Sequence, residues 1–363
     1  MKIIIIGPAF PWRGGIAHHT NTLASHLKKK HNVEVVTFRR QYPKLFFPGK
    51  SQYDPSSKAL DLPVSELIDS INPFNWVLTA FKIRKKKADL IIFAYSLPFF
   101  GPCFGTIAAI ARCRANTKAL FLCHNIIPHE HRIGDKIFTK FAFAFSDYFL
   151  VQSATVEQDL LKIKTKANYL VSPHPLYEMF GNPILKEEAK KALNISTKKV
   201  ILYFGYIRQY KGLAILIKAM EHLHDILLLV VGEFYDNKSK YEALIHQLNL
   251  ESCIRIIDDY VPNERVPAYF SAADAVILPY LSATQSGIAQ IAYNFDKPVI
   301  ASNVGGLAEV VVDGKTGFVV PANDSDKLAE AITKFYRENR ENEFSENVKI
   351  EKIKYSWDHF VET

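Results

Sequence analysis

The hydrophobic residues of this chain gather in short continuous runs and do not alternate with polar ones. Six runs fall in the first half: Lys2–Ile6, Val33–Phe38, Asp89–Tyr95, Lys118–Cys123, Asp147–Val151 and Asn168–Ser172. Six more fall in the second half: Lys199–Phe204, Ile226–Gly232, Cys253–Asp258, Asp274–Leu278, Pro298–Ala301 and Gly317–Val320. Continuous apolar runs are typical of strands buried on both faces. The stretches between them leave room for βα crossovers, so the pattern predicts an α/β protein with parallel sheets.

A segment rich in proline separates the two sets of runs. Ser172–Pro183 contains three prolines and one glycine in twelve residues, which is typical of a linker between domains. We therefore expect two doubly wound domains of similar size. Arg39–Pro73 is rich in Pro, Tyr and Phe but lacks clear periodicity, and it is predicted to be a long excursion over the first domain.

Charge distinguishes the two halves of the chain. Residues 1–175 hold 24 Lys and Arg against 11 Asp and Glu, whereas residues 176–363 hold 21 against 26. A strongly basic half attracts anionic partners such as lipid headgroups. Lys28–Lys30 and Arg84–Lys87 also fit solvated helix ends, where cations are favourable. No nucleic-acid-binding module is recognised.

Neither a membrane span nor a metal framework is predicted. No stretch approaches the roughly 18–20 apolar residues of a membrane helix, and the apolar run after Met1 is too short for a signal peptide. We therefore expect a cytoplasmic protein, with a peripheral position on the inner face of the membrane left open. The four cysteines form no C-x-x-C pair, so no structural zinc is predicted.

Glycines follow the first predicted strand. Gly7 and the pair Gly14-Gly15 bracket the turn into a predicted helix, where glycine lets backbone amides approach a ligand at the positive end of the helix. A tight turn that needs glycine only for its dihedral angles is the alternative. The spacing is neither a Walker loop nor a complete G-x-G-x-x-G, which counts against ATP hydrolysis and ordinary NAD binding.

A histidine follows the fourth predicted strand. His124 and Asn125 stand at a carboxyl end, the edge at which parallel sheets gather ligands. A neutral imidazole there can donate to a sugar hydroxyl or orient an acceptor, and a purely structural histidine is the alternative. His129 and His131, in the polar loop beyond, are predicted to lie on the surface.

Two cations follow the first strand of the second half. Gly205 opens a turn that carries Arg208 and Lys211 before an apolar helix begins. Fixed positive charges at a carboxyl edge suit a diphosphate leaving group, on which negative charge develops as its bond to a sugar breaks. Incidental cations in a solvated loop are the alternative.

A third loop, rich in small polar residues, precedes a short predicted helix. Its candidate ligand-binding residues are Tyr280, Thr284, Gln285, Ser286, Gly287 and Ile288. Hydroxyl residues and glycine are typical of helix N-caps, and free amides there bind anions. We expect this loop to hold, from a second side, the same phosphates as Arg208 and Lys211.

Together these segments resemble the retaining nucleotide-sugar glycosyltransferases of family four, which have the GT-B fold. The likeness covers nearly the whole chain and is most specific in Gly205–Gly212, Asp274–Tyr280 and Lys297–Glu309. It implies two Rossmann-like domains that face each other across a cleft. Their ranges would be 1–175 for the acceptor-binding domain, 176–354 for the donor-binding domain, and 355–363 for a tail that crosses back onto the first.

The resemblance also implies roles for the candidate residues. Lys211, with Arg208, would neutralise the donor diphosphate, and His124 would face the donor sugar. Gly14, Gly15 and Asn125 would lie near the phosphates or the acceptor. The nucleotide would be seated at Gly205, Gly232, Glu233, Tyr260 and Val261. No metal and no other cofactor is implied, and the sugar would be transferred with retention.

The chain departs from the family pattern at two places. The family usually has Arg directly after the glycine of its first motif, where this chain has Tyr206, and Arg208 stands two residues on. Many members carry two glutamates seven residues apart in the helix-entry motif, whereas residues 280–295 contain no Asp or Glu. Gln285 and Gln290 offer uncharged hydrogen-bonding groups there.

The expected function is that of a hexosyltransferase-type enzyme of polysaccharide biosynthesis. It would move a sugar from a nucleotide-diphospho-sugar, such as a UDP-sugar, to a lipid-linked or glycan acceptor. The missing carboxylates raise the alternative of a sugar-nucleotide-binding subunit that no longer catalyses. A third hypothesis is another GT-B enzyme, such as a sugar-nucleotide epimerase. An anionic membrane surface is a further expected partner, and nucleic acid is not.

Overall fold

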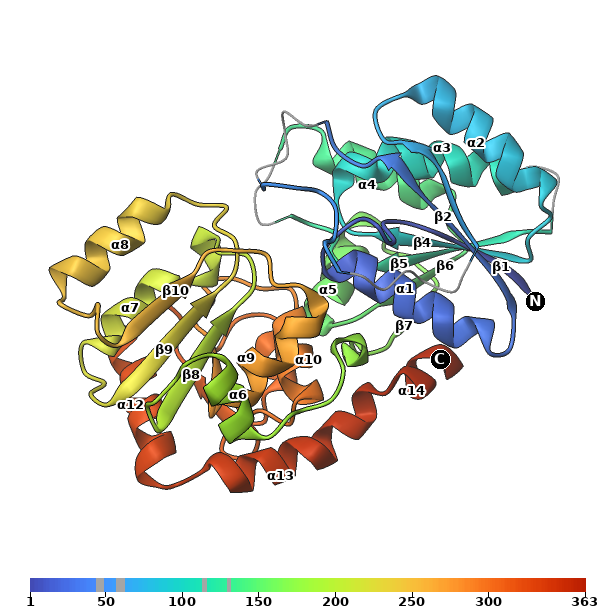
Figure 1. Cartoon of the computed structure of the whole chain (residues 1–363). Coiled ribbons are helices and arrows are strands. Elements are labelled where there is room, and N and C mark those ends of the chain that lie inside the picture. The colour runs from blue at the N-terminus through green and yellow to red at the C-terminus, as the bar shows by residue number, and fades with distance from the viewer. Residues whose placement is uncertain (44–48, 57–62, 113–115, 129–131) are drawn as a thin grey trace. The chain divides into compact units, whose positions relative to one another are not determined.

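The computed structural model describes the chain except residues 44–48, 57–62, 113–115 and 129–131. His129 and His131 therefore lie outside the described residues. Contacts divide the chain into two units: Met1–Pro173 with Trp357–Thr363, and His174–Ser356. Each unit is a parallel sheet with helices packed against it (Figure 1).

The sheet of the first unit has the strand order β3-β2-β1-β4-β5-β6-β7, with every neighbouring pair parallel. Its strands are β1 (Lys2–Ile6), β2 (Asn32–Arg40), β3 (Val64–Asp69), β4 (Leu90–Tyr95), β5 (Lys118–Cys123), β6 (Tyr148–Val151) and β7 (Tyr169–Val171). Successive side chains of a strand enter different cores, because Ile4 and Ile6 pack in one apolar cluster and Ile3 and Ile5 in another. This two-sided burial explains why the apolar runs do not alternate.

Helices cover both faces of this first sheet. They are α1 (Gly15–Lys28), α2 (Pro73–Lys85), α3 (Gly101–Arg112), α4 (Asp135–Ala144), α5 (Ala154–Ile163) and α14 (Trp357–Glu362). Helices α2 to α5 contribute to the core that contains Ile4. Helix α1 contributes Leu23 and Ala24, and α14 contributes Trp357 and Phe360, to the core on the opposite face.

The sheet of the second unit has the order β10-β9-β8-β11-β12-β13, again parallel throughout. Its strands are β8 (Lys199–Phe204), β9 (Ile226–Val231), β10 (Ile254–Ile257), β11 (Ala275–Leu278), β12 (Val299–Ser302) and β13 (Gly317–Val320). Its helices are α6 (Lys186–Ala192), α7 (Leu213–Met220), α8 (Lys238–Gln247), α9 (Val266–Ala272), α10 (Gly287–Asn294), α11 (Leu307–Val310), α12 (Ser325–Arg337) and α13 (Glu341–Glu351). Helices α7, α8 and α12 share one core, and α6, α9, α10 and α11 share the other. No helix in the described part of the chain is long and apolar enough to cross a membrane.

All twelve predicted strands are present, with ends that differ by at most two residues. The prediction for Arg39–Pro73 was wrong in part, because Val64–Asp69 forms β3. This strand lies at the edge of the sheet, where β2 is its one neighbour, and several of its side chains are partly exposed. An edge strand needs no continuous apolar run, so its sequence gave no strand signal.

A buried carboxylate ties the second sheet to two helices. Asp274, immediately before β11, is 2% exposed. Its Oδ2 accepts hydrogen bonds from the amide of Val200 at 2.7 Å and from the Tyr336 hydroxyl at 2.8 Å. It also forms an ion pair with Lys186. Asp274 therefore joins the starts of β8 and β11 to α6 and α12.

We expect Asp274→Ala to lower the free energy of unfolding by about 3 kcal/mol, because it leaves two donors, the Val200 amide and the Tyr336 hydroxyl, without their buried acceptor. Urea denaturation followed by circular dichroism measures this. The control is Asp326→Ala, because Asp326 has a side chain that is 78% exposed and should cost less than about 1 kcal/mol. Equal losses in the two variants would contradict the structural role of Asp274.

Candidate functional site

The carboxyl ends of neighbouring strands form one edge of the second sheet. Strands β10, β9, β8 and β11 are adjacent in that order. Strands β9 and β10 lie on one side of β8, whereas β11 to β13 lie on the other. Open α/β sheets bind ligands at such a reversal of strand order, in the crevice beyond the carboxyl ends. The predicted donor-binding residues follow these four strands, so the topology brings them to one edge.

Two glycines allow the loops after β8 and β9 to touch. Gly205 has a φ of 100° and Gly232 a φ of 147°, both unfavourable for other residues. A Cβ atom on Gly232 would lie 2.1 Å from the carbonyl oxygen of Gly205. A Cβ on Gly205 would lie 3.0 Å from Cδ1 of Ile288 and 3.3 Å from Nζ of Lys211. The structure therefore brings together four of the predicted residues, from three segments that are far apart in sequence.

Lys211 carries its ammonium group into this edge. The residue is 9% exposed, and Nζ lies 5.7 Å from the ring centroid of Tyr280. Burial, with a smaller contribution from the charge of Arg208, lowers the pKa of Lys211 to about 7. The ion pairs of the described residues include no carboxylate partner for it. A desolvated cation without a counter-ion favours binding of an anion.

The guanidinium of Arg208 lies over an aromatic ring. Its Cζ is 5.0 Å from the centroid of Tyr235, which stacks on Tyr206 at 4.6 Å. Tyr206 also lies 6.3 Å from Tyr260, which follows β10. Tyr235 was not predicted as a site residue, because it lies 27 positions after Arg208. Tyr206, at the position where the family usually has arginine, thus supports the ring that holds Arg208.

The remaining predicted nucleotide residues lie along the same edge. Glu233, directly after Gly232, is 2% exposed, and its carbonyl oxygen accepts a hydrogen bond from the amide of Ile207 at 3.0 Å. Tyr260 and Val261 are half-buried. Glu233 therefore fixes the loop after β9 to the loop after β8 through its backbone.

The loop before α10 leaves the helix amides without a side-chain cap. Ser286 stands at the N-cap position but makes no capping hydrogen bond, and its Oγ lies 3.3 Å from the Tyr280 hydroxyl. The carbonyl of Thr284 accepts a hydrogen bond from Gly306 at 3.1 Å. A Cβ on Gly287 would lie 2.9 Å from the ring of Tyr177. The loop is thus fixed from both ends, and the helix start keeps the positive potential of uncapped amides.

Helix α10 also carries a buried amide. Gln290 is 1% exposed, and among the described residues its Oε1 has no hydrogen-bond partner. A buried polar atom without a partner costs about 1–3 kcal/mol, which a ligand that hydrogen-bonds to it recovers. Gln285, in the loop before the helix, is half-buried.

In the first unit, the glycine loop after β1 is held by hydrogen bonds to the long segment Arg39–Pro73. Gly14 has a φ of 109° and stands at the N-cap of α1, followed by Gly15 as the first helical residue. The amide of Arg13 donates to the carbonyl of Gln52 at 3.0 Å, and the amide of Asp54 donates to that of Pro11 at 2.8 Å. These bonds fix the loop in front of the first turn of α1, the kind of position at which helix amides bind anions.

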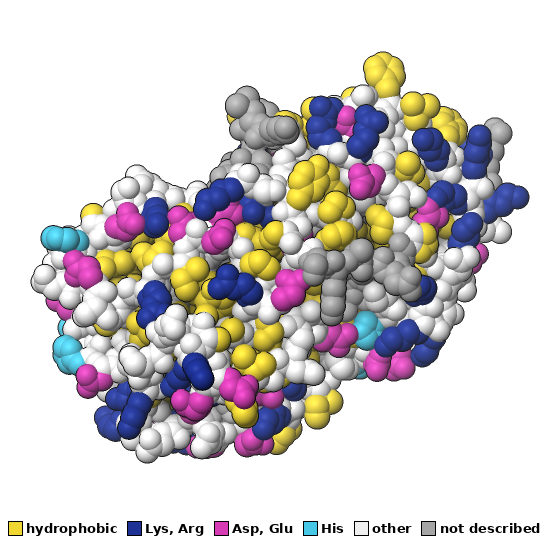
Figure 2. All heavy atoms as spheres, viewed as in Figure 1, with side chains coloured by type: hydrophobic (Ala, Val, Ile, Leu, Met, Phe, Trp, Pro, Cys, Tyr) yellow, Lys and Arg dark blue, Asp and Glu magenta, His cyan; other side chains and the backbone are white. Residues whose placement is uncertain are grey.

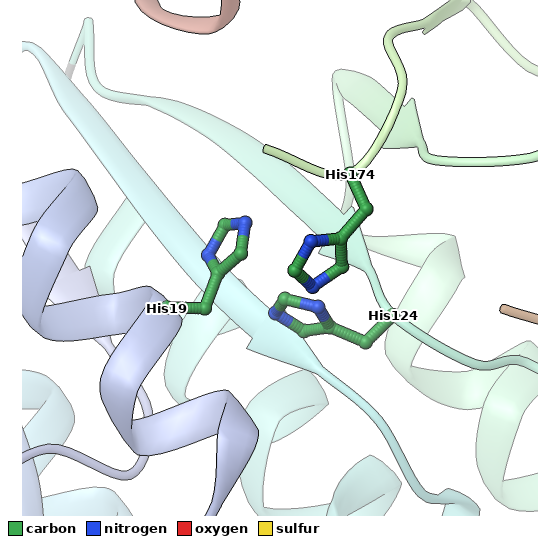
Figure 3. A group of neighbouring side chains, drawn as sticks. All are labelled: His19, His124 and His174. Carbon is green, nitrogen blue, oxygen red and sulfur yellow. The ribbon is translucent and has the colours of Figure 1, made fainter. Parts of the chain in front are cut away.

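His124 packs against a second histidine that the sequence did not reveal. Its amide donates to the carbonyl of Tyr95 at 2.8 Å, and its ring meets that of His19 edge-on at 4.6 Å. Figure 3 shows the two rings next to each other, His19 on α1 and His124 after β5, and also labels His174, the first residue of the second unit. Two imidazoles supply half of a tetrahedral zinc set, so the prediction of no metal stays a prediction.

Two neighbours complete the surroundings of these rings. Nε2 of His19 lies 3.0 Å from Nε2 of Gln152, and its ring lies 4.9 Å from that of Trp357. Oδ1 of Asn125 is buried and has no hydrogen-bond partner among the described residues. The loop after β5 therefore places a buried histidine and an open amide acceptor side by side.

Comparison with known proteins gives the two units a family. The model "Glycosyltransferase Family 4" matches residues 13–173, and "Glycosyl transferases group 1" matches residues 186–351, so the two models together match most of the chain. The chain belongs to the family-4 glycosyltransferases. This confirms the family likeness, and the predicted GT-B architecture of two Rossmann-like units agrees with it.

One relative of the chain is the D-inositol 3-phosphate glycosyltransferase of Corynebacterium glutamicum. It is 31% identical over 175 residues, which are 45% of this chain and 42% of that protein. The chain thus spans less than half of the length of that relative. An uncharacterised glycosyltransferase of Methanocaldococcus jannaschii is 24% identical over 99% of this chain and 96% of its own length.

Solved structures show the same fold. HepE of Anabaena, solved in complex with UDP-glucose, has a TM-score of 0.79 at 17% identity, with 98% of this chain and 96% of that chain covered. Sucrose-phosphate synthase of Thermosynechococcus elongatus has a TM-score of 0.78 at 19% identity, with 99% and 96% covered. The GT-B fold is therefore shown for this chain.

We expect Lys211→Met to raise the free energy of unfolding at pH 7, because it replaces a buried cation with an uncharged side chain of similar shape. Between pH 7 and 9 the native Lys211 is mostly neutral while the unfolded chain still binds the proton, so the stability of the unsubstituted protein rises with pH. The gain of the variant should therefore shrink by up to about 1.4 kcal/mol per pH unit. Urea titrations of both proteins at pH 7, 8 and 9 measure this.

The matched control is Lys218→Met, since Lys218 is an exposed lysine on α7. Its stability difference from the unsubstituted protein should not change with pH. A constant difference for Lys211→Met as well would show that Lys211 is not desolvated.

Proposed function

We propose that this family-4 protein transfers a sugar from a nucleotide-diphospho-sugar to a hydroxyl of a lipid-linked or glycan acceptor. The observation that carries the proposal is the buried Lys211, whose Nζ lies beside Gly205 and which has no carboxylate partner among the described residues. In the reaction the bond from the anomeric carbon to the β-phosphate oxygen breaks and a bond to the acceptor oxygen forms. The proton of the acceptor hydroxyl passes to the departing diphosphate.

In this proposal, cations and amides stabilise the leaving group. Lys211 and Arg208 bind the diphosphate from the side of β8, and the amides at the start of α10, from Ser286 to Ile288, bind it from the side of β11. Charge that develops on the β-phosphate strengthens these contacts in the transition state. Fixed cations supply this stabilisation without a metal ion, so we propose a metal-independent reaction that needs no cofactor beyond the co-substrate.

We propose a UDP-sugar as the donor. The structures of HepE bound to UDP and to UDP-glucose support this base, because that protein has the same fold. Gly232, Glu233, Tyr260 and Val261 would seat the nucleotide along the carboxyl ends of β9 and β10. Gln285 and Gln290 would hydrogen-bond to hydroxyls of the sugar in place of the absent glutamates.

We assign the acceptor to the first unit. The glycine loop at Gly14 and Gly15, together with His124 and Asn125, offers amides, an imidazole and an open amide oxygen for phosphate or hydroxyl groups. The proposal includes transfer with retention at the anomeric carbon and a place in polysaccharide biosynthesis. It also includes a cytoplasmic location with peripheral contact to an anionic membrane surface, because the first half of the chain is basic.

The absence of carboxylates in residues 280–295 favours a second candidate function. A subunit that binds a sugar nucleotide without catalysing transfer needs the phosphate contacts but not the sugar contacts. Tight binding of a nucleoside diphosphate without turnover in a broad screen would support this candidate. A sugar-nucleotide epimerase would change the sugar with no acceptor present, and product analysis distinguishes it.

We expect Lys211→Met to lose affinity for nucleoside diphosphate by about tenfold or more, since one charge-assisted contact contributes about 1.5–3 kcal/mol. A thermal-shift screen with UDP, GDP, ADP and their sugars identifies the base, because a bound ligand raises the midpoint. Isothermal titration and release of nucleoside diphosphate from donor and acceptor then compare the variant with Lys218→Met. Unchanged binding and turnover in Lys211→Met would remove Lys211 from the site.

The role of Gln290 is tested by Gln290→Leu, which keeps the size of the side chain and removes the amide. Its affinity for the sugar nucleotide should fall about fivefold to tenfold, the value of one neutral hydrogen bond, while its affinity for the nucleoside diphosphate stays the same. Calorimetric titration with both ligands measures the two effects. An equal loss for both ligands would point to a change in the fold of α10 rather than a sugar contact.

A further inference from the structure

Helix α2 turns an apolar face to solvent. Phe74 is 82% exposed, Leu78 63% and Phe81 46%, and the spacing i, i+4, i+7 places them on one side of the helix. The opposite side, with Thr79, Ala80 and Ile83, is buried. The helix is well capped, because the side chain of Asn72 accepts a hydrogen bond from the amide of Asn75 at 3.2 Å. The exposed side chains thus belong to a regular, firmly packed helix.

Helix α4 adds a second set of exposed apolar side chains. Ile137 is 70% exposed, and Phe138 and Phe141 are each 41% exposed. Two glycines on α3 let α4 approach closely, because a Cβ on Gly101 would lie 2.4 Å from the carbonyl oxygen of Phe138, and one on Gly105 would lie 2.6 Å from the ring of Phe141. The backbone of α4 and the ring of Phe141 therefore lie against α3.

The two helices share one outward surface. Helix α3 packs against α2 on one side and α4 on the other, and all three cover the same face of the sheet. The sides of α2 and α4 that point away from the sheet therefore point in the same direction. We call this surface the α2–α4 face and define it by Phe74, Leu78, Phe81, Ile137, Phe138 and Phe141.

Basic residues accompany the α2–α4 face. Exposed lysines lie on the same helices: Lys82 and Lys85 on α2, and Lys136 and Lys140 on α4. Among the described residues of α2, α3 and α4, Asp135 is the single acidic one. Figure 2 shows hydrophobic and basic side chains next to one another over α2, at the upper right. The surface is thus apolar and positively charged at once.

We propose that the α2–α4 face is the surface on which the first unit lies on a bilayer that contains anionic lipids. Phenylalanine and leucine would enter the boundary between headgroups and acyl chains, and the lysines would contact the headgroup phosphates. The charge selects this occupant, because a second copy of the same face would set lysines against lysines. The proposal deepens the membrane contact of the proposed function, on which it rests for its biological meaning.

The experiment measures co-sedimentation of the full chain with vesicles in the absence of donor and acceptor. Vesicles of phosphatidylcholine with 30% phosphatidylglycerol are compared with pure phosphatidylcholine at two salt concentrations. We expect binding to the anionic vesicles that weakens with salt. The double variant Lys82→Gln/Lys85→Gln should bind at least tenfold more weakly, since each lysine near a charged surface contributes roughly fivefold.

The apolar contribution has its own variant and control. Phe74→Glu/Leu78→Glu should lose most of its vesicle binding. Ile350→Glu/Ile353→Glu, which changes two equally exposed apolar residues of the second unit, should bind as the unsubstituted protein does. Circular dichroism and the thermal midpoint verify folding of each variant. If a variant does not fold, the milder double variant Phe74→Ser/Leu78→Ser tests the same contact.

Several outcomes would overturn the proposal. One is equal binding to both kinds of vesicle. Another is full binding by the Phe74→Glu/Leu78→Glu variant or by Phe74→Ser/Leu78→Ser. A third is a dimer in light scattering that the Phe74→Glu/Leu78→Glu variant converts to a monomer without a change in vesicle binding. Nucleoside diphosphate release with a water-soluble acceptor is measured in parallel. Release without vesicle binding overturns the membrane face alone, whereas vesicle binding without release overturns the transfer reaction alone.

Discussion

The second unit is organised around the desolvation of one ammonium group. Lys211 is buried, and the described part of the chain gives it no carboxylate partner. Such an arrangement costs stability, and a folded chain keeps it only where the surrounding structure enforces it. Tight turns enforce it here. A Cβ on Gly212, where φ is 69°, would lie 1.8 Å from the carbonyl of Pro279, so this turn is fixed against the end of β11. Burial in the two apolar cores of the unit offsets the unfavourable free energy of the buried cation.

The surroundings of this cation contain aromatic rings and amides in place of additional acids. Tyr235 and Tyr206 support Arg208 through stacking, and Gln290 stands on the helix that begins at the same edge. Because residues 280–295 contain no acid, no carboxylate of the helix-entry loop offsets the positive potential of Lys211, Arg208 and the start of α10. The residues at this edge therefore favour binding of an anion over binding of neutral hydroxyl groups.

Much of the fold could be predicted because strands that are buried on both faces appear in the sequence as continuous apolar runs. The edge strand Val64–Asp69 could not be predicted in this way, because a partly exposed strand with one neighbour does not need such a run. The glycine turns at Gly205 and Gly232 were predictable from residue type, since few other residues adopt their conformation. The ring contacts of Tyr235 and His19 were not, because they depend on how loops distant in sequence meet.

The tail of the chain has a consequence for the order in which the protein is completed during synthesis. Trp357 and Phe360 pack with Ile3, Ile5 and Leu23 in a core of the first unit, yet the ribosome makes them after the whole second unit. Domains generally fold in the order of their synthesis. Here the first unit emerges early with one face of its sheet uncovered beside α1, and that apolar face is closed only when α14 has been made. Chaperones that act on nascent chains would therefore find their binding surface on the part of the protein that was made first.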